Sequence, residues 1–346
     1  MAQTFGGRWR IVSDLPQGGQ AHVYLVKDMS GAIAEQCALK RLANPLRLAR
    51  FVDEVSTLRD LDHKGITKLL DFDLEAERPW FVQEYCEGGD LENFVLQGKL
   101  TSPRIAFEFF IQLCDALAYA HDRSKVHRDI KPANVFLRAS EGPAVLGDFG
   151  LTFVVDGHDE RITLTFEQVG SRFYMAPELR DGILKYPTAS CDIYSLGKVL
   201  YFMLTNGKKF DRENFDDPSF DVVKLTGNIY LEHANILFRK MIVHDPEGRS
   251  TAQQLADDGA QAMRLIEGSY PALEGRHLPP CSYCGIGNYE QAANNLSDYQ
   301  GFFGFTSSGI TSAAEGFRAM ACNHCGHVQL FRMKSPGTSW WRPGSQ

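Results

Sequence analysis

Long hydrophobic runs are missing from this chain of 346 residues, because nowhere do eighteen apolar residues stand together. A membrane-spanning helix needs about 20 of them, so we expect no such helix. The first ten residues also lack the apolar stretch after a basic patch that marks a secretory leader. Both absences predict a cytoplasmic protein that does not act on membranes.

An excess of positive charge is missing too. Lys and Arg number 36 against 43 Asp and Glu, which gives a formal net charge of −7. This balance disfavours nonspecific attachment to nucleic acid or to anionic membranes. The hydrophobic fraction of 44% is ordinary for a globular protein, and the length suits about two domains.

The eight cysteines are unevenly placed. Four of the eight cysteines stand singly and read as reduced core or pocket thiols: Cys37, Cys86, Cys114 and Cys191. The others form two C-x-x-C pairs, each followed by glycine: Cys281 with Cys284, and Cys322 with Cys325. Each pair can bend so that both thiolates reach one cation, which predicts a structural Zn²⁺ site. A redox dithiol, an iron site with the same ligands and unconnected buried cysteines are the alternatives.

Apolar periodicity predicts an α+β chain. Alternation over residues 9–40, with turn signals at Gly18-Gly19 and Ser30-Gly31, indicates antiparallel strands, and residues 72–85 return to strand character. Apolar residues at spacings of three and four predict helices in the other segments: 46–61, 103–121, 192–204, 231–243, and one that Ser250 caps and that runs through 263.

The composition changes after residue 267. Residues 268–280 contain three prolines and two glycines, which predicts a linker. Residues 281–331 include both cysteine pairs and are similar to a zinc ribbon, so we expect a small β module there. Residues 332–346 read as a flexible tail.

The most informative motif is His-Arg-Asp-Ile-Lys-Pro-Ala-Asn at residues 127–134, which Asp148-Phe149-Gly150 follows. Phosphoryl transfer needs an acid near the attacking hydroxyl, a metal-holding acid and cations on the phosphates. The two motifs contain these groups in that order. A buried acid that caps a turn would explain Asp129 or Asp148 singly, but not their joint spacing.

Residues 8–267 resemble the protein kinase family, and specifically its Ser/Thr class, because several motifs occur in the family's order. Leu15 to Val23 stand in place of the glycine loop, and Ala38-Leu39-Lys40 and Ala176-Pro177-Glu178 match further motifs. The resemblance implies a two-lobed fold, with a small antiparallel β lobe plus one helix and a larger helical lobe. It also implies ATP and Mg²⁺ (or Mn²⁺) as cofactors, beside Zn²⁺ in the module.

The resemblance further implies roles in catalysis. Asp129 would orient the acceptor hydroxyl and accept its proton, and Lys131 would neutralise charge on the γ-phosphate. Asn134 and Asp148 would hold Mg²⁺ through hard oxygen ligands. Lys40 would hold the α- and β-phosphates, and Glu54 on the following helix would pair with it.

A nucleotide site is implied in the same way. Gln83 would stand at the back of the adenine pocket, the main chain of Glu84 and Cys86 would bind the base edge, and the ring would lie between the side chains of Val23, Ala38 and Phe136. Pro16 and Ala21 replace two glycines of the family's loop, and proline removes an amide donor. The whole expected ATP site is Leu15, Gly18, Gly19, Val23, Ala38, Lys40, Gln83, Glu84, Cys86, Asn134, Phe136 and Asp148.

The stretch between Asp148 and Ala176 reads as an activation segment. Thr163 and Thr165 are candidate phosphorylation sites, whose phosphate Arg128 would bind, although solvated loop threonines are an equal alternative. Four residues are expected to support the architecture: Ser171 near the catalytic aspartate, Glu178 in an ion pair with Arg249, and Asp192 on the backbone of the catalytic loop.

These features predict an ATP- and Mg²⁺-dependent Ser/Thr protein kinase that transfers the γ-phosphate to protein hydroxyls. Its zinc module would serve docking to a partner or regulation. One alternative is a pseudokinase scaffold that binds nucleotide and presents the zinc module. Another makes the module a nucleic-acid reader, which its nearly balanced charge does not favour.

Overall fold

The computed structural model describes residues 4–15, 21–149, 172–181 and 187–266, together with the strands Tyr289–Gln291, Phe317–Cys322, Val328–Ser335 and Ser339–Trp341. The chain divides into two compact units. One comprises Met1–Ile229 with Leu237–Met263, and the other Tyr230–Ile236 with Arg264–Gln346. No helix in the described ranges has the length and apolarity to cross a membrane.

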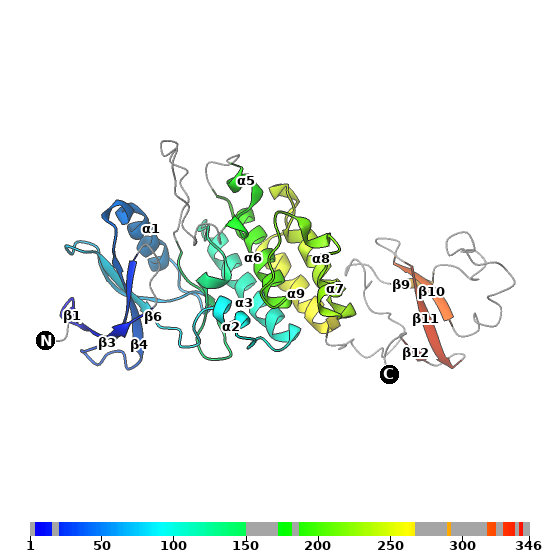
Figure 1. The fold of residues 1–346 in the computed structure, drawn as a ribbon, viewed down its shortest axis with the longest axis horizontal. Helices are drawn as coiled ribbons and strands as arrows, with labels where there is room; N and C mark the ends of the chain where they lie inside the picture. The colour runs from blue at the N-terminus through cyan, green and yellow to red at the C-terminus, as the bar shows by residue number, and fades with distance from the viewer. Residues whose placement is uncertain are drawn as a thin grey trace. The chain divides into compact units, whose positions relative to one another are not determined.

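The first unit opens with a six-stranded antiparallel sheet in the order β1-β2-β3-β4-β6-β5 (Figure 1). Its strands are β1 (Thr4–Phe5), β2 (Trp9–Asp14), β3 (Ala21–Asp28), β4 (Gln36–Leu42), β5 (Leu69–Asp73) and β6 (Trp80–Glu84). Helix α1 (Leu48–Arg59) follows β4, and its Phe51 ring lies 5.1 Å from that of Phe81 on β6. This is the small β lobe with one helix that the sequence predicts.

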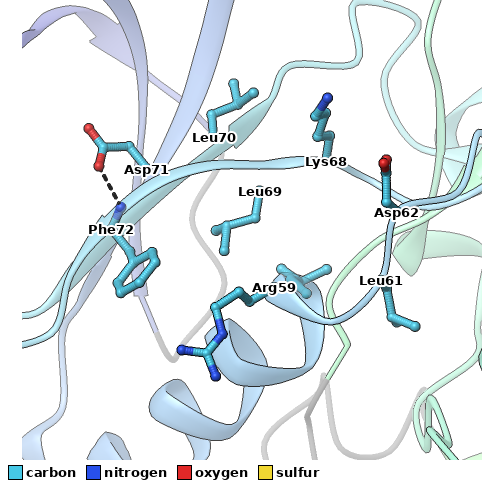
Figure 2. A pocket seen from close by; sticks show the side chains of 9 residues that line it. Arg59, Leu61, Asp62, Lys68, Leu69, Leu70, Asp71 and Phe72 are labelled. Atoms are coloured by element: carbon cyan, nitrogen blue, oxygen red, sulfur yellow. Dashed lines mark hydrogen bonds between the residues drawn. The ribbon is translucent and has the colours of Figure 1, made fainter. Parts of the chain in front are cut away.

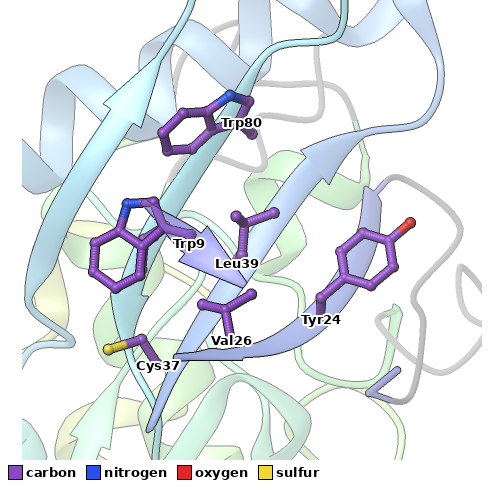
Figure 3. Packing of buried hydrophobic residues seen from close by; sticks show 7 residues of the cluster. Trp9, Tyr24, Val26, Cys37, Leu39 and Trp80 are labelled. Carbon is purple, nitrogen blue, oxygen red and sulfur yellow. The ribbon is translucent and has the colours of Figure 1, made fainter. Parts of the chain in front are cut away.

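Alternation gives the sheet two distinct faces. On one face an aromatic and aliphatic cluster is buried, as Figure 3 shows: Trp9, Tyr24, Val26, Cys37, Leu39, Trp80 and Val82. Since neighbouring residues point to opposite sides, Ala38, Lys40 and Phe81 belong to the other face, where α1 packs. The cluster therefore anchors β4 while leaving Lys40 on the face that meets α1.

Helices dominate the rest of this unit. They are α2 (Leu91–Leu96), α3 (Pro103–His121), α5 (Pro177–Arg180), α6 (Ala189–Leu204), α7 (Val222–Thr226), the part of α8 (Glu232–Met241) from Leu237 onward and α9 (Ala252–Ile266) as far as Met263, with the two-stranded sheet of β7 (Val135–Leu137) and β8 (Ala144–Leu146). Every residue from Cys191 to Leu204 is buried, so α6 is a central core helix. A Cβ on Gly197 would lie 2.7 Å from Cγ1 of Ile242, which explains the glycine at this packed position.

Helix ends follow their caps. Ser102 caps α3 through the N–H of Ile105, and Pro103 takes the first turn, at the residue where the predicted helix 103–121 begins. For α9 the predicted cap Ser250 is wrong. Thr251 accepts from the N–H of Gln254, and Gln254 Oε1 accepts from the N–H of Thr251, so this reciprocal pair sets the helix start.

The second unit contains a four-stranded antiparallel sheet in the order β12-β11-β10-β9. Its strands are β9 (Tyr289–Gln291), β10 (Phe317–Cys322), β11 (Val328–Ser335) and β12 (Ser339–Trp341). Strand structure thus extends into residues 332–346, which the sequence pattern assigns to a tail. The aromatic pair in β12 has high strand propensity, and β12 pairs with β11 at Arg332 and Met333.

Candidate active site

Three predicted residues meet on the α1 face of the sheet. Lys40 Nζ lies 3.0 Å from Glu54 Oε1 and also donates to Asp148, which follows β8. Burial disfavours the charged ammonium, but the carboxylates of Asp148 and Glu54 outweigh it and raise the pKa of Lys40. Burial likewise raises the pKa of Glu54, and Lys40 opposes that shift. The triad joins sheet, helix and loop in one electrostatic unit.

A second cluster surrounds Asp129. Lys131 Nζ donates to its Oδ2 at 2.8 Å, and Asn134 Nδ2 donates to the same oxygen at 2.9 Å and to the Asp129 carbonyl at 2.7 Å. Burial raises the pKa of this carboxyl, with Lys131 acting against the shift. A buried acid with a raised pKa beside a lysine can accept a proton from an incoming hydroxyl.

Asp192 on α6 holds the loop that contains Asp129. Asp192 accepts the N–H of His127 and that of Arg128, each at 2.8 Å. His121 adds a contact of 2.9 Å to the same carboxylate. Arg128 has a φ of 75°, which is costly for a side chain other than glycine, so these bonds hold a strained backbone in place.

The predicted nucleotide residues come from several strands. Val23 pairs with Lys40, and Ala38 with Gln83, across neighbouring strands. Phe136 lies on β7, where a Cβ on Gly147 would approach its ring within 2.6 Å. Gln83 is 4% exposed, and its Oε1 has no hydrogen-bond partner in the described part of the chain. Leu15 and Cys86 are described, whereas Gly18 and Gly19 lie outside the described residues.

Two residues near these clusters have oxygen atoms that suit a cation. Asn134 uses its amide nitrogen on Asp129, so its carbonyl oxygen remains the atom for a metal. Asp148, in the second predicted motif, has a carboxylate as the other expected ligand. Two hard oxygen donors fit Mg²⁺, which keeps most of its waters and needs only one or two protein carboxylates together with phosphates.

Segment 172–181 is tied to the helical lobe. Arg249 makes two bonds to Glu178, of 2.6 and 2.8 Å, and both side chains are nearly inaccessible. Ser195 Oγ donates to the Tyr174 carbonyl at 2.8 Å. The predicted residues Ser171, Thr163 and Thr165 lie outside the described residues.

The structure gives partners to two basic side chains that the sequence patterns did not identify. Arg138, just after β7, forms a two-bond contact with Glu84. Lys198 lies inside α6 and is 4% exposed. For Lys198 the sequence offered one signal, a single lysine within the apolar run of α6. For Arg138 the sequence offered no signal.

A separate groove of about 320 Å³ lies between the end of α1 and β5 (Figure 2). Leu58, Leu61 and Leu69 line it together with the charged side chains of Arg59 and Lys68. None of the predicted catalytic or nucleotide residues takes part in its lining. The groove is therefore distinct from the clusters around Lys40 and Asp129.

The predicted zinc ligands lie mostly beyond what the structure describes. Cys281, Cys284 and Cys325 are outside the described residues, and Cys322 ends β10, where its backbone pairs with Tyr289. Among the described residues no group of three or more His, Cys, Asp or Glu side chains could hold a metal ion.

Comparison with known proteins agrees with this arrangement. A family model described as the protein kinase domain matches residues 9–259. The chain therefore belongs to the protein kinase family.

Particular relatives carry Ser/Thr kinase names. Over 237 residues the chain is 31% identical to human "Serine/threonine-protein kinase ULK3". The matched segment covers 66% of this chain and 49% of that protein. It is 33% identical over 219 residues to "Serine/threonine-protein kinase PrkC" of Bacillus subtilis, covering 62% of this chain and 33% of that one. The chain thus spans half or less of the length of these relatives.

Proposed function

We propose that the chain is a Ser/Thr protein kinase, which transfers the γ-phosphate of ATP to hydroxyl groups of proteins. The observation that carries the proposal is the joint presence of two clusters: Lys40 with Glu54 and Asp148, and Asp129 with Lys131 and Asn134. The names of the curated relatives support the Ser/Thr class.

Each cluster has a distinct task in this proposal. Lys40, held by Glu54, binds the nonreacting phosphates and fixes their position. Asp129 orients the acceptor hydroxyl and takes its proton, while Lys131 balances the charge that grows on the transferred group. Asn134 and Asp148 hold Mg²⁺, which neutralises phosphate charge when bound. Most of the rate enhancement then comes from positioning and electrostatic stabilisation.

The test compares the wild type with Asp129→Asn, using labelled ATP, Mg²⁺ and dephosphorylated casein. Loss of the proton acceptor should lower the transfer rate by about 100-fold or more, while ATP still binds. Lys240→Gln is the control, because Lys240 pairs with Asp258 in a partly buried contact that involves neither cluster. Equal labelling by wild type and Asp129→Asn, with ATP bound, would instead favour the pseudokinase scaffold.

We propose that Arg128 binds the phosphate of a phosphorylated Thr163 or Thr165. Its guanidinium lies 3.4 Å from Asp53 on α1, so an acidic partner is already near it. Phosphate would have to compete with this carboxylate, and mass spectrometry of the active protein tests whether either threonine is modified.

The four paired cysteines are proposed to bind one structural Zn²⁺ in a module for docking or regulation. Support comes from their spacing and from the place of Cys322, which ends β10 directly after Ala321, the residue that pairs with Val328 on β11. The proposed domains are the predicted ones: a kinase domain at 8–267, a linker at 268–280 and this module at 281–331.

A further inference from the structure

Lys198 is a buried lysine that the proposed chemistry does not use. Its Nζ donates to the Phe210 carbonyl at 3.1 Å and to the Arg212 carbonyl, and lies 3.5 Å from the centre of the Phe210 ring. Taking an ammonium out of water is costly, so the carbonyls and the ring face must replace its hydration. The side chain thereby fixes the backbone of loop 210–213 onto α6.

Loop 210–213 is bound to the end of α5 by two reciprocal ion pairs. Arg180 Nη1 lies 2.7 Å from Asp211 Oδ1. In the opposite direction, Arg212 donates to both carboxylate oxygens of Asp181, each at 3.2 Å. Each partner therefore contributes one cation and one anion. Arg212 has a φ of 49°, an unfavourable value for arginine that persists only if its surroundings hold it.

The segment that the loop grips also forms a wall beside the catalytic acid. Tyr174, Met175 and Leu179 line a small pocket together with Asp129 and Ile130. Ser195 fixes the Tyr174 carbonyl near the start of this segment, and Arg249 fixes Glu178 at its middle. Loop 210–213 is a third attachment, at the end.

We propose that Lys198 is a positioning residue for the protein acceptor: by fixing loop 210–213 it sets the place of α5 and of the pocket wall beside Asp129. This inference rests on the proposed kinase function. Lys198 touches neither nucleotide residues nor Asp129, so its loss should disturb acceptor binding more than ATP binding.

The first experiment measures KM for casein, KM for ATP and kcat in wild type and Lys198→Met. Methionine keeps the length of the side chain but cannot donate to the two carbonyls. We expect the KM for casein to rise about 10-fold, because the buried Phe210 carbonyl and the partly buried Arg212 carbonyl lose their donor, while the KM for ATP and kcat change less than about twofold. Lys240→Gln, which breaks the partly buried pair with Asp258, should leave all three constants unchanged.

A second series keeps the inference testable if Lys198→Met does not fold. Arg212→Asp and Asp181→Arg should each raise the KM for casein about threefold, since like charges then face each other across a partly exposed contact. Aspartate tolerates a left-handed backbone, so the exchange is compatible with position 212. The double variant Arg212→Asp/Asp181→Arg restores opposite charges and should return the KM toward the wild-type value.

The outcomes separate this inference from the proposed function. If the wild type does not phosphorylate casein while binding ATP, the kinase proposal fails. If the wild type is active and a folded Lys198→Met lowers kcat without raising the KM for casein, Lys198 has only a general structural role. Failure of the double exchange to rescue either single variant would likewise overturn the link between the loop and α5.

Discussion

At the scale of single residues, the charge of Lys198 depends on groups from three elements. Burial lowers the pKa of Lys198 to about 7. Glu213 and Asp211, in the loop, oppose this shift, whereas Arg180 at the end of α5 adds to it. The hydroxyl of Tyr194, on the same helix as Lys198, donates to Glu213 at 3.1 Å and keeps that carboxylate in place.

A pH dependence of stability follows from this pKa. The ordinary value is 10.5, so the unfolded chain binds more protons than the folded one between about pH 7 and pH 10. The contribution of this group to the free energy of unfolding therefore rises with pH across that window, by at most about 1.4 kcal/mol per pH unit. Below pH 7 the buried amine is protonated, and the destabilisation from burying its charge is then complete. The check is urea unfolding of wild type and Lys198→Met at pH 6, 7, 8 and 9.

The difference between the two proteins isolates the lysine, because other titrating groups are shared. The difference in free energy of unfolding between wild type and Lys198→Met should stay constant from pH 6 to 7. It should then shift in favour of the wild type at pH 8 and 9. A difference that stays constant over the whole range would mean that Lys198 remains charged in the folded protein.

Residues with a motif around them could be predicted, and residues without one could not. Lys40, Glu54 and Asp148 are separated in sequence, and only the order of the motifs predicts that they contact one another. Lys198 and Arg138 bind backbone carbonyls or a single carboxylate, and any sequence can offer those partners. The fold alone brings such partners into reach.

At the scale of elements, Arg138 connects β7, β6 and the loop after α1. Its guanidinium donates to both carboxylate oxygens of Glu84, at 3.1 and 2.9 Å, and also to the carbonyls of Lys64 and Ile66. Glu84 Oε1 further accepts the N–H of Lys68 at 3.1 Å. The planar fork thus fixes the end of β6, where the adenine base is predicted to bind.

Arg138→Lys should weaken nucleotide binding through this connection. A lysine presents one point charge and cannot reproduce the forked contact, so we expect the Kd to rise about fivefold. Because the contact supports the base and not the phosphates, adenosine and ATP should weaken by the same factor. Isothermal titration calorimetry of both ligands gives the comparison.

Arg104→Lys is the matched control for this exchange. Arg104 forms a contact of 2.8 Å with Glu108 on the surface of α3, so the same substitution there should leave both affinities unchanged. A loss of ATP affinity with unchanged adenosine binding would place the effect of Arg138 on the phosphates and contradict the prediction.

Element boundaries show where sequence patterns reach their limit. The start of α3 could be predicted because Ser102 and Pro103 are unambiguous signals. At α9, both Ser250 and Thr251 can cap a helix, and the choice depends on which one Gln254 reaches. Strand β1 and the short pair β7 and β8 have too few residues for a detectable period, although β7 carries Phe136.

At the scale of the whole molecule, the two compact units have different sources of stability. The first buries an aromatic cluster and a central helix, while the second presents four strands of three to eight residues. Small β modules bury little apolar surface, and a bound metal then supplies folding free energy. If the proposed Zn²⁺ site is correct, we expect zinc to stabilise the second unit and not the first.

Removal of the proposed zinc ligands should therefore affect one unit only. We expect about one zinc per wild-type chain by elemental mass spectrometry, as one Cys₄ site binds one ion, and none in Cys281→Ser/Cys322→Ser. Thermal unfolding should lose stability in the second unit alone, and casein phosphorylation should stay within about twofold of the wild type, because the catalytic clusters lie in the first unit. Cys37→Ser/Cys191→Ser, at two cysteines that stand singly, should keep its zinc. Zinc retained after loss of Cys281 and Cys322 would assign the metal to other ligands, and a loss of kinase activity would show that the two units are coupled.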